Sequence, residues 1–65
     1  MSKRRRFTDD FKLGDKVSVI RTEHGWFDGS LVGTITEIGD YHCIVTDKDG
    51  IGYYILKPRD IYKIR

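Results

Sequence analysis

Cysteine, proline and long apolar runs are nearly absent from this chain of 65 residues, which has one cysteine and one proline. A single cysteine cannot form an intrachain disulfide or a zinc site built from several thiolates. No stretch approaches the roughly 18 apolar residues of a membrane helix, and the basic start is not followed by the apolar run of a secretory signal. These absences predict a soluble, cytoplasmic protein that does not insert into membranes.

The groups that usually carry catalysis are equally sparse. His24 and His42 are the only imidazoles and Cys43 is the only thiol, and neighbours in a strand point to opposite faces, so His42 and Cys43 cannot act together. The sequence has no nucleophile placed with a base, no metal-ligand spacing, no phosphate-binding loop and no dinucleotide fingerprint. It therefore predicts a protein that is not an enzyme and that holds no cofactor or metal.

Composition favours a small folded domain. Hydrophobic residues make up 38% of the chain and charged residues 34%, a balance typical of a globular protein. A domain this short buries only about 60% of the surface that its unfolded chain exposes, so the core must be thin. The formal net charge of +2 is too small to indicate nucleic-acid binding by itself, so the placement of the cations has to decide that question.

Alternation of apolar and polar residues predicts a series of short β-strands. Asp49-Gly50 is a strong hairpin signal, Pro58 predicts a 3₁₀ turn over residues 57–60, and Gly33 indicates a close backbone approach or a bend inside the second strand. The expected strands cover residues 16–21, 31–38, 41–46, 51–56 and 61–64. The expected core residues are Val17, Val19, Ile35, Ile44, Val45, Ile55, Ile61 and Ile64.

The polar segment of residues 21–30 contains two glycines, Gly25 and Gly29, and is too long for a tight hairpin, so it predicts an extended loop. Short strands in a flat sheet would leave exposed edges, whereas closure into a barrel removes them. We therefore expect an all-β fold, a small five-stranded SH3-like barrel over residues 11–65. A flexible, disordered basic tail over residues 1–10 is expected to precede it.

Residues 13–64 resemble an SH3-like barrel of the broad kind that includes KOW-type modules, and the opening strands are similar to subunit IV of photosystem I. The resemblance depends on Gly14-Asp15-Lys16-Val17, Val19-Ile20-Arg21, Trp26-Phe27, Gly33-Thr34-Ile35 and the closing run from Arg59-Asp60-Ile61 to Ile64. The KOW resemblance implies binding of RNA, ribosomal components or transcription machinery. The photosystem resemblance implies docking on a large complex, but the chain departs from that pattern after Ile38, where a tight turn replaces a long loop.

Two candidate binding sites follow from these patterns. The first is an aromatic pair in the loop, which predicts a non-catalytic interaction module that binds a protein partner. Such a module is expected to be a monomer that serves as a small accessory subunit or modulator of a larger complex. Its residues are Trp26, Phe27, His24 and Asp28. The alternative is a KOW-like nucleic-acid or ribonucleoprotein-binding module, in which cations near both chain ends contact phosphates and an exposed aromatic stacks on a base. Its residues are Arg4, Arg5, Arg6, Lys57, Arg59, Lys63 and Arg65.

Overall fold

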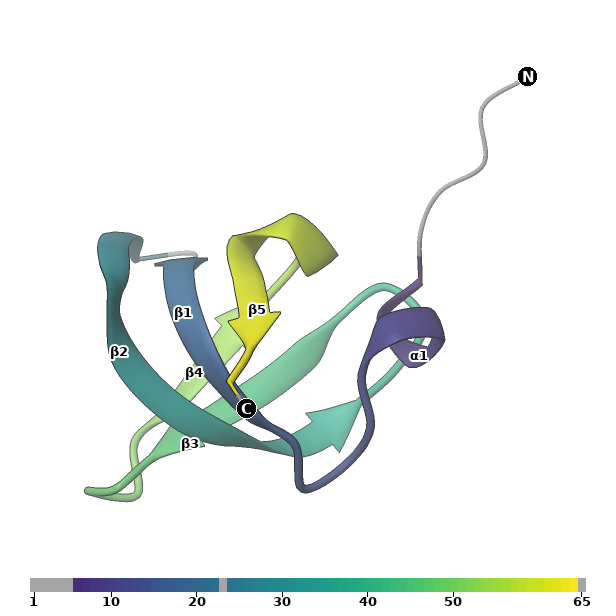
Figure 1. Ribbon diagram of the computed structural model, residues 1–65, viewed down its shortest axis with the longest axis horizontal. Helices are drawn as coiled ribbons and strands as arrows, with labels where there is room; N and C mark the ends of the chain where they lie inside the picture. The colour runs from purple at the N-terminus through teal and green to yellow at the C-terminus, as the bar shows by residue number, and fades with distance from the viewer. Residues whose placement is uncertain (1–5, 23, 65) are drawn as a thin grey trace.

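The computed structural model describes residues 6–22 and 24–64, which form one antiparallel sheet. The sheet has five strands in the order β4-β3-β2-β1-β5 and curls into a half-barrel (Figure 1). This architecture confirms a small all-β fold. The expected closure is incomplete, because β4 and β5 remain the two edges of the sheet. The strands are β1 (Lys16–Thr22), β2 (Gly25–Ile38), β3 (Cys43–Asp47), β4 (Gly52–Ile55) and β5 (Ile61–Lys63).

The hairpin of β1 and β2 occupies the segment that was expected to be an extended loop. Lys16 pairs with Thr34, and the ladder continues to Thr22 and Gly25 at the far end. A register shift between Val19 and Arg21 interrupts the alternation of the two strands. The loop prediction was wrong because this irregularity, together with polar side chains beyond the core, conceals the strand period in the sequence. Gly25, with a φ of +127°, adopts the left-handed backbone that the reversal requires.

A single helical turn, α1 (Phe7–Asp10), packs against the sheet in the region that was expected to be a flexible tail. The Phe7 side chain is fully buried, and its N–H donates to the carbonyl of Asp40 at 2.9 Å. The start of the folded unit therefore moves from residue 11 to residue 7. No pattern in the sequence indicated this, because one aromatic residue after a basic run shows no periodicity. The predictions for residues 1–5 lie outside the described part of the chain.

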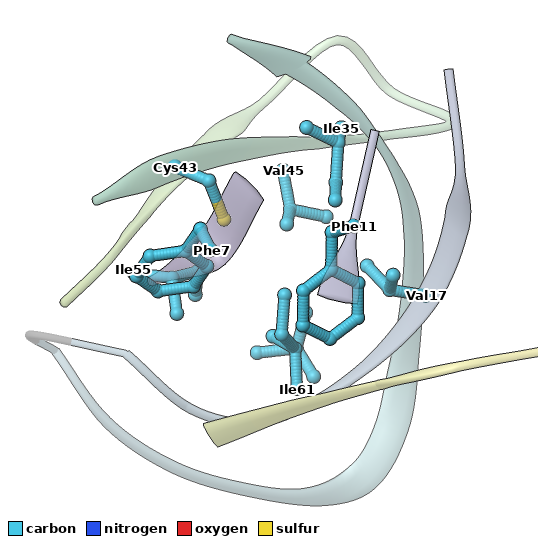
Figure 2. Packing of buried hydrophobic residues seen from close by; sticks show 9 residues of the cluster. Phe7, Phe11, Val17, Ile35, Cys43, Val45, Ile55 and Ile61 are labelled. Atoms are coloured by element: carbon cyan, nitrogen blue, oxygen red, sulfur yellow. The ribbon is translucent and has the colours of Figure 1, made fainter. Parts of the chain in front are cut away.

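The core gathers side chains from α1 and from all five strands (Figure 2). Ile44 and Ile64 were wrongly assigned to it. Ile44 is paired with Tyr54 on the outer face of the sheet, while its neighbours in β3 point inward, and Ile64 lies exposed after the end of β5. Phe7, Phe11 and Cys43 belong to the core and were not predicted. The buried hydrophobic residues are Phe7, Phe11, Val17, Val19, Ile35, Cys43, Val45, Ile55 and Ile61.

The predicted turn between β3 and β4 is confirmed. Asp47 Oδ1 accepts hydrogen bonds from the backbone N–H groups of Asp49 at 2.9 Å and Ile51 at 3.0 Å, and Gly50 has a φ of +83°. The predicted 3₁₀ turn is also present as η1 (Pro58–Asp60), with proline in its first turn. These two reversals determine where β4 begins and where β5 follows.

Candidate groove and basic rim

An open groove of about 700 Å³ lies between α1 and β5. Phe11 and Ile61 belong to its lining and are nearly fully buried, while the more exposed side chains of Leu56 and Tyr41 come from the ends of neighbouring elements. In Figure 1, β5 has β1 on one side and α1 beyond its other side. The groove therefore runs along the side of β5 that no strand of the described chain covers.

The backbone of β5 presents polar groups to this side. Ile64 donates from its N–H to the carbonyl of Lys16 at 3.0 Å, and Ser18 is paired with Tyr62. In an antiparallel pair the hydrogen-bonded residues alternate with residues whose N–H and C=O point away from the partner strand. The backbone groups of Ile61 and Lys63 therefore point away from β1, although the Ile61 N–H already donates to the Pro58 carbonyl.

Three cations from the segment of η1 and β5 line the groove. Lys57, Arg59 and Lys63 all line it, and Asp10 is the acidic residue in the same lining. Lys63 Nζ lies 3.5 Å from Asp15 Oδ2, so part of its charge is balanced. Within residues 6–22 and 24–64, no ion pair involves Lys57 or Arg59. The groove thus combines an apolar interior with a net positive rim.

A smaller hollow of about 110 Å³ lies beside the groove, near the tip of the β1–β2 hairpin. Leu56 and Lys57 line both depressions, and Arg21 lines the smaller one. The Arg21 guanidinium lies 5.1 Å from the ring centroid of Trp26, a cation–π contact. Trp26 is 72% exposed, so a large aromatic surface lies beside Arg21, which lines the smaller hollow.

Of the residues predicted to bind a partner, those whose side chains the structure describes do not all lie on one surface. Trp26 and His24 are exposed, and the His24 N–H donates to Thr22 Oγ1 at 3.0 Å. Phe27 instead packs against the core and meets Tyr53 edge to face, with ring centroids 5.6 Å apart. Trp26 and Phe27 therefore do not act as a pair of anchors on one surface, because neighbours in a strand face opposite sides. The side chain of Asp28 lies outside the described part of the structure.

The basic residues of the alternative prediction divide in a similar way. Lys57, Arg59 and Lys63 come together at the groove. Arg6 lies at the start of α1, where its Nε is 3.7 Å from Asp9 Oδ2. Arg4, Arg5 and Arg65 lie outside the described residues. Phe11 and Leu56 also line the groove and were not predicted as site residues; they come from distant segments, and only the fold brings them together.

The predicted separation of His42 and Cys43 is confirmed. The His42 ring stacks on Tyr54 on the outer face, with centroids 5.4 Å apart and planes inclined by 9°, whereas Cys43 is fully buried in the core. Burial raises the pKa of Cys43 to about 12. In the described ranges, no cluster of histidine, cysteine and acidic residues has the arrangement of a metal site, and no helix has the length and apolar character needed to cross a membrane.

Cys43 is expected to resist alkylation by iodoacetamide at pH 8 and to react at least about 100-fold faster in denaturing urea, because only the thiolate is nucleophilic. The raised pKa also has a consequence for stability. Between the ordinary thiol pKa of 9.0 and the native value of about 12, the unfolded chain loses a proton that the folded chain keeps. Rising pH over this range therefore lowers the free energy of unfolding, whereas the contribution of Cys43 to stability is fully present below the ordinary thiol pKa. Mass spectrometry of alkylated samples measures the first effect, and equal rates in buffer and urea would contradict it.

Comparisons of this chain with protein-family models, with curated proteins and with solved structures gave no match. The geometry and charge of the groove are the observations from which its function is inferred.

Proposed function

We propose that the protein is a non-catalytic interaction module that binds a segment of a protein partner in the groove beside β5. The observation that carries this proposal is an apolar groove with a net positive rim. A module of this size would act as an accessory subunit or modulator of a larger complex. The exposed Trp26 side chain would extend the contact toward the β1–β2 hairpin, because it lies against Arg21, which lines the smaller hollow beside the groove.

Exposed apolar side chains around the groove support this proposal. Leu56 is 50% exposed, and Tyr41 and Tyr62 are also largely accessible. Gathered apolar surface on a small protein marks a place where a partner gains free energy by excluding water. Aromatic residues often contribute most of the binding energy at such contacts. Trp26 adds an aromatic side chain at the edge of the same surface.

Nucleic-acid binding is the second candidate, because three cations of that prediction, Lys57, Arg59 and Lys63, share the groove with Tyr41 and Tyr62. The tyrosines would stack on bases and the cations would contact phosphates. The apolar interior favours a peptide over a nucleic acid, since nucleic-acid interfaces are more polar and more strongly basic. Titration with single-stranded oligonucleotides at two salt concentrations separates the candidates, because phosphate binding weakens steeply with salt.

A matched pair of substitutions tests the groove. Leu56→Glu places a charge in its wall and is expected to weaken binding at least about tenfold for peptides selected from a displayed random library against the parent protein. Ile51→Glu makes the same kind of change at a side chain that is 52% exposed, compared with 50% for Leu56, in the turn between β3 and β4. Ile51→Glu should bind like the parent. Equal binding by all three proteins, each with unchanged circular dichroism, would rule out the groove as the site.

A further inference from the structure

We propose that the occupant of the groove is an extended, acidic segment of a partner protein that joins the sheet as an additional strand along β5. The inference rests on the proposed function, because it identifies the ligand of the same groove. It adds a binding mode, strand addition, in which main-chain hydrogen bonds align the segment along β5 and alternating side chains contribute affinity and specificity.

The first support is the position of β5 at the edge of the sheet. The N–H and C=O of Lys63 and the C=O of Ile61 point to the uncovered side, where the groove begins. An added strand would satisfy these groups in the way that β2 satisfies β1. Because β5 has only three residues, the added strand pairs over a length of about 10 Å. Side chains therefore have to supply much of the affinity.

The second support is charge complementarity. Every other residue of an added strand points to the same face, so apolar residues on one face of the segment can pack on Phe11 and Leu56. Carboxylates at the positions between them can approach Lys57 and Arg59, which pair with no acidic residue in the part of the chain that the structure describes. An acidic segment whose apolar residues alternate with carboxylates satisfies both requirements.

The same charges disfavour two other occupants. Residues 3–6 of this chain are Lys-Arg-Arg-Arg, and placing them in the groove would bring like charges together. A second copy that paired edge to edge through β5 would bring two basic rims together. A partner segment of opposite charge avoids both repulsions.

The test uses the full chain and a short capped peptide in which valine and isoleucine alternate with glutamate and aspartate. Fluorescence anisotropy measures affinity, and amide hydrogen exchange followed by NMR reports on β5. We expect binding that slows exchange of the Lys63 N–H. Two N-methylated peptides are compared, one methylated at the odd positions and one at the even positions. Methylation of the residues whose N–H groups face β5 should weaken binding at least about tenfold, and methylation of the other residues should weaken it much less, because only the first set of N–H groups donates to the sheet. Lys57→Glu and Arg59→Glu should each weaken binding several-fold.

The outcomes separate this inference from the proposed function. Equal binding by both N-methylated peptides, or an unprotected Lys63 N–H, overturns strand addition and leaves the groove as a protein-binding site. Failure of the acidic peptide while library-selected peptides still depend on Leu56 overturns the acidic ligand alone. If neither the acidic peptide nor any library peptide binds, both proposals are overturned. Salt-sensitive binding of an oligonucleotide that displaces the peptides also overturns both. Concentration-dependent dimerisation that is abolished by Lys63→Pro, with the fold intact, would assign the edge to a second copy and overturn this inference.

Discussion

Replacement of Phe7 by alanine is expected to destabilise the protein by about 3–5 kcal/mol, the usual cost of removing a buried phenylalanine side chain. Phe7 is fully buried and has Phe11 6.3 Å away, centroid to centroid. Domains of fewer than about 70–80 residues rarely have more than about 3–5 kcal/mol of net stability. One substitution in a single turn of helix should therefore unfold a large fraction of the molecules.

Thr8→Ala is the matched control, because Thr8 is the exposed neighbour of Phe7 in the same turn. We expect it to change stability by less than about 0.5 kcal/mol. Urea denaturation followed by circular dichroism gives the free energy of unfolding of both variants. A Phe7→Ala protein with an unchanged urea midpoint would show that α1 contributes little to the core and that the folded unit does begin near residue 11.

The sequence predicted the sheet more successfully than the segment before it. Strand periodicity is local, so the first and last strands and the second half of β2 could be located from alternating residues, and the turn after Asp47 from its aspartate and glycine. The face of β3 was misassigned in part, because Ile44 is as apolar as its inward neighbours Cys43 and Val45. Hydrophobicity does not distinguish the two faces where both carry apolar side chains.

The groove could not have been predicted in the same way. Its cations were recognised as a set, but its apolar lining comes from residues near α1, before β3 and after β4, which approach one another only when the sheet curls. Trp26 was expected to lie on the binding surface together with Phe27, although the β1–β2 hairpin places the two on opposite faces. Sequence patterns therefore identified residue types suited to binding, whereas the shape of the site depends on tertiary contacts.

Gly33 is the position at which a sequence prediction and the packing of the sheet agree most closely. It lies in β2, paired with Val17 on one side and Asp47 on the other. A Cβ atom placed on Gly33 would lie 2.6 Å from Val45 Cγ1 and 2.7 Å from the carbonyl oxygen of Thr46. The prediction of a close backbone approach is therefore confirmed, because β3 lies alongside β2 so close to Gly33 that no room is left for a side chain.

Gly33→Ala is accordingly expected to destabilise the protein by about 2–3 kcal/mol, since an overfilled core forces the backbone to shift. Rotation of Val45 would relieve one contact, but the Thr46 carbonyl belongs to the main chain and moves only if β3 separates from β2. Gly52→Ala, in neighbouring β4, is the matched control. There the new Cβ would meet the Ile44 Cγ2 methyl group at 3.2 Å, a contact that a shift of a few tenths of an ångström relieves, so a change below about 1 kcal/mol is expected. Thermal and urea unfolding measure the stability of both variants. Equal stability of Gly33→Ala and Gly52→Ala would mean that β2 and β3 can separate at Gly33 without cost. The curl of the sheet, on which the groove depends, would then not be set by this contact.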